Sequence, residues 1–436
     1  MWFRRKPDKL SAANRRSEQP GQRASPLAGT LKRVRLPVDL IRPGMKVVKL
    51  DRPWTEVPVL FQGFTLHSDD EARILRQYCD WVVVEDEAER LAPILASLPA
   101  LKQKTSQPLT ETRPLEQELH RAADAWNRTH KFIEKVIRDI EQHNELELAS
   151  ARPLIQSCAE SVKANASAMF WMARIKTRDA YTAEHSLRVA VFTMAFARFL
   201  GLPEEDLEVV GMCGLLHDIG KLRVPGEILN KPGPLSPSEH AVMREHTTLG
   251  HTMLKQDSSL DPIISDVTLH HHERIDGRGY PHQLPEWQIS RYARMIAIVD
   301  AYDAMTSDRC YRNGMSPAEA VRILFKNRGH QFDTSMVEAF IRMVGIYPPG
   351  SLVELSTGEV ALVVSSHPAR KLTPKVEILL DANKHPVPPR VLDLGDQRLP
   401  DSPARTISAP LPDGAYGISL QGRISQLMAK TVADRS

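Results

Sequence analysis

His217-Asp218-Ile219-Gly220-Lys221 is the stretch that decides how this sequence is interpreted. It follows Leu207, Val210 and Gly214, which share one face of a predicted helix with His217. An adjacent imidazole and carboxylate can bind one metal ion together, and the second carboxylate oxygen can bridge to another ion. A single His-Asp pair also occurs as a helix cap or as a buried hydrogen-bonded pair, so the interpretation depends on the residues around it.

Histidines gather on both sides of this stretch. Upstream, His185 lies on the apolar face of a predicted helix, where a lone histidine is more often a hydrogen-bonded core residue. Downstream, His246 lies in the helix that begins at Ser236. Three consecutive histidines at 270–272 then run into the glycine-rich turn Asp276-Gly-Arg-Gly-Tyr-Pro281. Imidazoles gathered this densely are hard to explain as packing, and they favour a metal site.

Two carboxylates complete the pattern. Asp300 and Asp303 stand at the end of the apolar helical run 295–303. An unpaired charge in such a position is costly, and a nearby cation would offset that cost.

The order of these residues resembles the HD-GYP branch of the HD phosphohydrolase superfamily over roughly residues 170–345. The resemblance rests on the His-Asp pair, the histidines before and after it, Asp300 and the intact Gly-Tyr-Pro element. It implies an all-helical domain with a binuclear or trinuclear metal centre, usually of iron or manganese. It also implies hydrolysis of the bacterial second messenger cyclic di-GMP.

The resemblance assigns a role to each matching position. The two groups of metal ligands would share Asp218 as a bridge: His185, His217, Asp218 and Asp300 for the first divalent metal, and His246, His271 and His272 for the second. Lys221 matches the family's phosphate-contacting lysine, and Arg309 and Arg312 match two further cationic substrate contacts. Tyr280 is expected to contact substrate or a partner domain.

Asp218 and Lys221 are the predicted catalytic residues. Two metals bridged by Asp218 would generate a hydroxide near neutral pH and stabilise the attacking and leaving oxygens of a displacement at phosphorus. Lys221 would offset the charge that builds on the phosphoryl oxygens.

One departure from the family pattern concerns a third metal. Trinuclear members carry a glutamate four residues before the first histidine, and Tyr181 stands at that position. Glu184 is a poor substitute, because on a helix it points about 100° away from its neighbour His185. The resemblance therefore predicts a binuclear site with pGpG as the main product, since complete hydrolysis to GMP is associated with the third metal.

Other polar residues near these motifs match no ligand position. His270 is expected to be structural or to support a ligand, and Asp303 to support a ligand or contact a helix rather than to ligate directly. Glu273 is expected either to orient a ligating histidine or to pair with Arg274 or Arg278.

The predicted fold class is mainly α, with an all-helical metallohydrolase domain between a small α+β domain and a small β module. Capping serines before Pro-x-Glu, as at Ser236 and Ser316, and short β-rich runs support this division. We expect six segments: a basic disordered tail (1–31), the α+β domain (32–100), a linker with a long amphipathic helix (101–151), the catalytic domain (152–346), the β module (347–395) and a loosely ordered end (396–436).

Residues 32–90 resemble the N-terminal domain of uncharacterised role that often precedes HD-GYP domains. The resemblance includes Asp51-Arg-Pro-Trp54 and Leu60-Phe-Gln-Gly63. The long helix over 114–148 could pack in a homodimer or on its own chain, and we favour its own chain.

Composition excludes several classes of protein. The 436 residues are too many for one core. Residues 1–35 hold ten Lys/Arg and two Asp/Glu, a net +8, so the rest of the chain carries −5 of the total of +3. Four scattered cysteines argue against a disulfide framework or a zinc ribbon. The sequence contains no apolar run of about 18 residues, so it predicts no membrane-spanning helix. We therefore expect a cytoplasmic protein.

Two other functions fit the same residues. The chain could be a cyclic di-GMP-responsive interaction module that binds protein partners through the Gly-Tyr-Pro loop or the N-terminal domain. It could also hydrolyse another cyclic dinucleotide. Loss of ligand residues would favour the interaction module, but no ligand residue of the two-metal family pattern is missing from the sequence.

Overall fold

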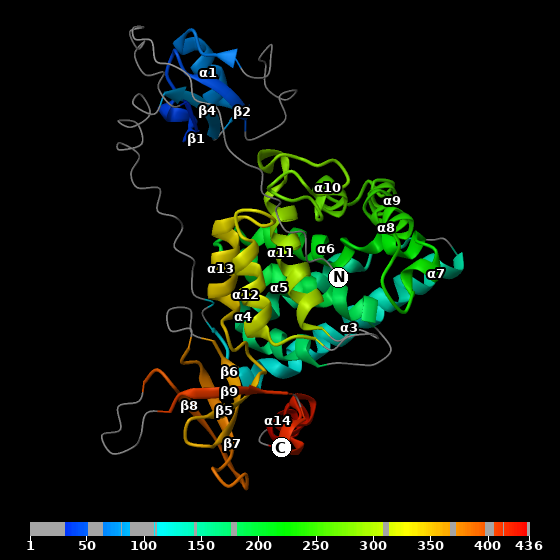
Figure 1. Cartoon of the computed structure of the whole chain (residues 1–436), viewed down its shortest axis with the longest axis vertical. Helices are drawn as coiled ribbons and strands as arrows, with labels where there is room; N and C mark the ends of the chain where they lie inside the picture. The colour runs from blue at the N-terminus through cyan, green and yellow to red at the C-terminus, as the bar shows by residue number, and fades with distance from the viewer. Residues whose placement is uncertain are drawn as a thin grey trace, which may run out of the picture. The chain divides into compact units, whose positions relative to one another are not determined.

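The computed structural model describes eleven parts of the chain: 31–50, 64–79, 81–87, 109, 111–143, 146–175, 181–307, 314–366, 372–396, 405–412 and 414–433. The chain divides into two compact units, Met1–Gln103 and Lys104–Ser436, each described by itself (Figure 1). Residues 1–30 of the predicted tail, and the runs 51–54 and 60–63 of the N-terminal resemblance, lie outside the described residues, whereas Leu31 belongs to a strand.

The described residues of the N-terminal unit form a small antiparallel sheet with the helix α1 (Asp69–Tyr78) and a short 3-10 helix. Its strands are β1 (Leu31–Pro37), β2 (Lys46–Leu50), β3 (Phe64–Thr65) and β4 (Trp81–Glu87), in the order β1-β4-β2-β3. Ser68 caps helix α1, because its hydroxyl accepts a hydrogen bond from the Glu71 N–H. The core of this unit includes Leu36, Leu75 and Val84.

Helices form the central part of the second unit. They are α3 (Leu115–His143), α4 (Ala151–Arg174), α5 (Tyr181–Phe199), α6 (Glu204–Leu216), α7 (Gly226–Leu229), α8 (Pro237–Arg244), α9 (His246–Leu254), α10 (Pro262–His270), α11 (Arg291–Thr306), α12 (Pro317–Asn327) and α13 (Thr334–Val344). Helix α5 lies at the centre and contacts α3, α4, α6, α11 and α13 (Figure 1). The helical part of the predicted fold class is confirmed.

Helix starts and close approaches follow from the local sequence. Ser236 and Glu239 form the predicted capping box at the start of α8, with Pro237 at the first helical position. Gly220 lies in the short 3-10 helix η3 (Ile219–Arg223), where a Cβ atom would come within 1.9 Å of the His246 carbonyl oxygen. Only glycine allows η3 to approach α9 this closely, and this contact brings Asp218 next to His246.

A second antiparallel sheet follows the helices. Its strands are β5 (Leu352–Leu355), β6 (Val360–Ser365), β7 (Lys375–Leu380), β8 (Pro386–Asp393) and β9 (Ile407–Leu411), in the order β8-β7-β6-β5-β9. Leu352, Leu362 and Leu380 belong to the same hydrophobic core as the central helices, while Val353 and Val376 belong to a separate cluster. The sheet therefore shares part of its core with the helices.

The expectation of a loosely ordered end over 396–436 was wrong for most of that segment. It contains strand β9 and helix α14 (Leu420–Ala433). Arg423 of α14 donates two hydrogen bonds to the buried Glu377 of β7, at 2.8 and 2.5 Å. Within the described part of the chain, no helix has the length and apolar character needed to cross a membrane.

Candidate metal centre

The His-Asp motif lies at the end of α6, inside the helical unit. His217 is fully buried, and its Nδ1–H donates to the Gly214 carbonyl oxygen at 2.8 Å. That bond fixes the tautomer, so the lone pair of Nε2 points away from the helix toward Asp218. His217 Nε2 lies 3.3 Å from Oδ2 of Asp218.

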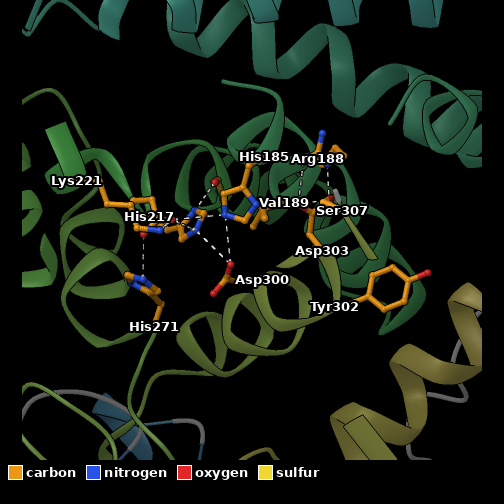
Figure 2. Close-up of polar contacts among 12 residues, drawn as sticks. His185, Arg188, Val189, His217, Lys221, His271, Asp300, Tyr302, Asp303 and Ser307 are labelled. Atoms are coloured by element: carbon orange, nitrogen blue, oxygen red, sulfur yellow. Dashed lines mark hydrogen bonds and ion pairs between the residues drawn. The ribbon is translucent and has the colours of Figure 1, made fainter. Parts of the chain in front are cut away.

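Helix α5, the end of α6 and the start of η3 supply one group of ligand atoms, which we call the His185 group: His185, His217 and Asp218. Nε2 of His185, from α5, lies 3.5 Å from Oδ2 of Asp218. Asp300, from α11, is close to the group, with its Oδ1 3.3 Å from His185 Nε2 and 3.9 Å from His217 Nε2. Figure 2 shows His185, His217 and Asp300 converging from different parts of the chain.

A second group, the His246 group, shares Asp218 and adds three histidines: Asp218, His246, His271 and His272. Oδ1 of Asp218 lies 3.3 Å from His246 Nε2 and 3.6 Å from His271 Nε2. Both of these histidines donate Nδ1–H to a carbonyl oxygen three residues earlier, at 2.7 and 2.9 Å. Asp218 thus faces one group with each carboxylate oxygen.

The polar atoms at this site are better explained by bound cations than by packing in a protein core. His217 Nε2 and Asp218 Oδ1 are buried and make no hydrogen bond in the described part of the chain. Burial raises the pKa of Asp218, but Lys221 and His217 outweigh burial and hold that pKa well below its ordinary value. A carboxylate next to several imidazole nitrogens is the donor set that divalent metals take.

The pKa values of three histidines at the site also favour a bound cation. Burial lowers the pKa of His246 to about 4 and that of His272 well below its ordinary value, so both rings are neutral near pH 7. Burial also acts to lower the pKa of His185, but Asp218 and Asp300 outweigh it and raise that pKa well above its ordinary value. Without a metal, the anionic site therefore attracts a proton to His185.

The predicted substrate contacts are only partly within the described residues. Lys221 donates a short hydrogen bond to Oδ2 of Asp218. Tyr280 stacks on His272, with ring centroids 4.7 Å apart and planes at 27°. Arg309 and Arg312 lie outside the described residues, and so does the side chain of Tyr181, on which the two-metal prediction depends.

Asp303, expected to support a ligand or contact a helix, lies in a buried polar network on the far side of His185, and the other members of this network were not predicted. Asp303 accepts a hydrogen bond from His185 Nδ1 at 2.8 Å and from Arg188 Nε at 2.7 Å (Figure 2). Ser307 Oγ donates to the same carboxylate at 3.2 Å, and Arg188 Nη1 donates to Glu184 at 3.2 Å. Burial raises the pKa of Asp303, but Arg188 and His185 outweigh burial and lower it to about 2. The one available sequence signal was an arginine one helical turn after His185.

Two residues flanking the ligands have roles that the structure defines. Glu273 is buried and accepts hydrogen bonds from the backbone N–H groups of His282 at 2.6 Å and Leu284 at 3.0 Å. The described contacts of its carboxylate are thus with the loop after Pro281, rather than with a ligating histidine or an arginine. His270 Nδ1 faces Asp266 at 3.0 Å and its Nε2 faces His282 at 3.1 Å, outside both ligand groups.

Comparisons with known proteins identify the family of this sequence. The sequence matches the family described as HD domain over residues 156–336, a domain of unknown function (DUF3391) over 33–151, and a KOW domain associated with HD domain over 352–399. A Pseudomonas aeruginosa protein named cyclic di-GMP phosphodiesterase PA4108 is 38% identical over 83% of this chain and 89% of its own length.

Two further matches are more partial. A Thermotoga maritima protein named cyclic di-GMP phosphodiesterase is 37% identical over 38% of this chain and 45% of its own length. A solved HDG"Y"P protein from Bdellovibrio bacteriovorus aligns with a TM-score of 0.42 at 17% identity, over 71% of this chain and 98% of that one. From the Pseudomonas match, which spans most of both proteins, we conclude that this chain belongs to the HD-GYP family of HD-domain proteins.

Proposed function

We propose that this protein is a metal-dependent phosphodiesterase that hydrolyses cyclic di-GMP to linear pGpG. The observation that carries the proposal is Asp218, whose two carboxylate oxygens each face a separate group of buried imidazoles. The names of relatives that are similar over most or part of this chain support the same substrate.

Two divalent cations, of iron or manganese, are part of the proposal. The His185 group with Asp300 would hold one cation, and the His246 group the other, with Asp218 bridging. Bound cations would lower the pKa of a water molecule and stabilise negative charge at the reacting phosphate. The prediction of two cations rather than three, and with it pGpG as product, rests on Tyr181 in the place of a glutamate.

The remaining roles belong to side chains that position substrate. We propose that Lys221, whose ammonium pairs with Asp218, contacts a phosphoryl oxygen. Arg309 and Arg312 are proposed as further phosphate contacts from the sequence pattern. Tyr280 orients His272 by stacking on it, and we propose that the ring edge also contacts substrate.

We place this activity in the cytoplasm, where reduced thiols such as those of the buried Cys79, Cys158 and Cys213 persist.

Hydrolysis by purified protein tests the proposal. The protein is loaded with Fe²⁺ or Mn²⁺ in anaerobic buffer, and the products of cyclic di-GMP are identified by chromatography. We expect pGpG from the wild type and its loss in His271→Ala. The matched control is His270→Ala, which removes the neighbouring histidine outside both ligand groups and should retain most activity.

Metal-loaded wild type that leaves cyclic di-GMP intact would contradict the proposal, and GMP as the main product would contradict its two-metal part. Competition with other cyclic dinucleotides tests the alternative substrates. In cells, His217→Ala with Asp218→Ala should abolish the effect of the protein; an effect that persisted would favour the interaction module.

A further inference from the structure

Arg244 is a cation beside the metal centre that the family pattern does not assign. It is the last residue of α8 and stands two residues before His246. Its side chain is exposed, and the guanidinium carbon lies 5.2 Å from the centroid of the Tyr280 ring. The same ring stacks on His272, so one aromatic side chain links Arg244 to a residue of the His246 group.

The backbone around Arg244 is fixed by the metal residues themselves. The carbonyl oxygen of Met243 accepts the Nδ1–H of His246 at 2.7 Å, and the carbonyl oxygen of Arg244 accepts the Thr247 hydroxyl at 3.1 Å. The cation–π contact with Tyr280 then restrains the side chain. Arg244 is thus held next to the site on a rigid backbone, which lowers the entropic cost of using it to bind a ligand.

Three of the described cations near the site pair with carboxylates. Lys221 pairs with Asp218, Arg188 with Asp303 and Arg274 with Asp276. Within the described part of the chain, Arg244 has no such partner. An exposed guanidinium without a carboxylate, at the edge of a phosphodiesterase site, is suited to a phosphate group, because its planar fork matches two phosphate oxygens.

We propose that Arg244 is a further substrate-binding residue that contacts the phosphate of the cyclic dinucleotide that is not being cleaved. The inference rests on the proposed function, because it assumes a substrate with two phosphates. The phosphate that is cleaved would bind next to the metal-binding nitrogens around Asp218. Arg244 lies at the edge of this group, because its guanidinium contacts Tyr280 and Tyr280 stacks on His272. The second phosphate of the same molecule is then assigned to Arg244, in addition to the contacts proposed for Arg309 and Arg312.

Steady-state kinetics with Mn²⁺-loaded enzyme tests this role. Arg244→Met should raise KM for cyclic di-GMP about tenfold with little change in kcat, because a charge-assisted contact made equally before and during reaction is lost. Arg244→Lys should recover part of the loss, and added salt should reduce the difference from wild type. Arg328→Met is the matched control, since Arg328 also lies over an aromatic ring, that of Phe325, and should leave KM unchanged.

Three results would overturn the inference: a KM of Arg244→Met within twofold of wild type, an equal rise in Arg328→Met, or loss of bound Mn²⁺ from Arg244→Met, which would mean that Arg244 acts through His246. A wild type that did not cleave cyclic di-GMP would refute the proposed function. Calorimetric binding of cyclic di-GMP would then decide the inference separately, with equal affinity of wild type and Arg244→Met counting against it.

Discussion

At the scale of single residues, the structure shows most clearly how Asp303 contacts a metal-ligand histidine. Its carboxylate contacts four donors, and one of them is the Nδ1–H of His185. A carboxylate in this position orients the ring and makes Nε2 a better metal donor. Asp303→Asn should therefore weaken Mn²⁺ binding about 10–100-fold, measured by competition with a chelator in the absence of substrate.

A matched variant separates this effect from the loss of any buried ion pair. Glu377→Gln also removes a buried carboxylate that holds an arginine, Arg423, but it does so in the C-terminal sheet. It should lower stability without changing Mn²⁺ affinity. Equal Mn²⁺ affinities of Asp303→Asn and wild type would show that His185 is oriented without the carboxylate.

The sequence predicted which ligand residues gather, because histidines and carboxylates crowded into ordered motifs are typical of metal sites and rare in ordinary cores. It could not predict the partner of Arg188, which lies 115 residues away at Asp303. Helical spacing places Arg188 near His185 on one face but says nothing about which side chain of α11 meets it. Long-range pairs of this kind depend on how helices pack, and no local pattern encodes them.

At the scale of elements, Glu273 anchors the first residues of the loop after Pro281. Glu273 accepts two backbone N–H groups of the loop while buried. Glu273→Gln replaces an acceptor oxygen with an N–H₂ group that faces a backbone donor, which should cost about 1–3 kcal/mol of unfolding free energy. Urea denaturation checks the value, and a loss below about 0.5 kcal/mol would show that water or a rearranged loop replaces the bonds.

Helix α8 offers a pH-dependent contribution to stability. A hydrogen bond from Lys231, and then those from Ser236, lower the pKa of Glu239 from 4.5 to about 2. Because the pKa is lower in the folded state, the ionised carboxylate stabilises the fold fully above about pH 4.5, and this contribution is lost as the pH falls toward 2. Melting temperatures of wild type and Glu239→Gln should therefore converge over this range; a constant difference would contradict the assignment.

Two elements near the C-terminus were not predicted from the sequence. Leu420, Ile424 and Leu427 are buried on one face of α14, and their i, i+4, i+7 spacing is a helix signal that could have been used. Strand β9 contains Pro410, which argues against a central strand, but β9 lies at the edge of its sheet, where proline is tolerated. Edge position depends on the whole sheet and cannot be inferred from five residues.

At the scale of the whole molecule, bound metal should stabilise the folded state. The buried carboxylate of Asp218 and the partly buried carboxylate of Asp300 face imidazole nitrogens whose lone pairs suit a cation. Metal at 100 times its dissociation constant adds about 2.7 kcal/mol, so a chelator should lower the melting temperature by several degrees. Asp218→Ala should make the melting temperature insensitive to Mn²⁺; an unchanged response would exclude Asp218 as the bridge.

Truncation at the two ends of the chain should have different effects on stability. The N-terminal sheet has its own core, built from residues such as Leu36, Val47 and Val84. The C-terminal sheet instead contributes side chains such as Leu352 and Leu380 to the core of the helical unit.

Residues 104–436 should therefore fold alone and keep the phosphodiesterase activity. Removal of residues 347–436 should be far more damaging, because each fully buried leucine that loses its contacts costs about 1.5–3 kcal/mol. Circular dichroism melts and Mn²⁺ binding of the two truncated chains check the difference. Equal stability of chains ending at 346 and 436 would show that the helical unit closes its core without the sheet, as an independent catalytic domain would.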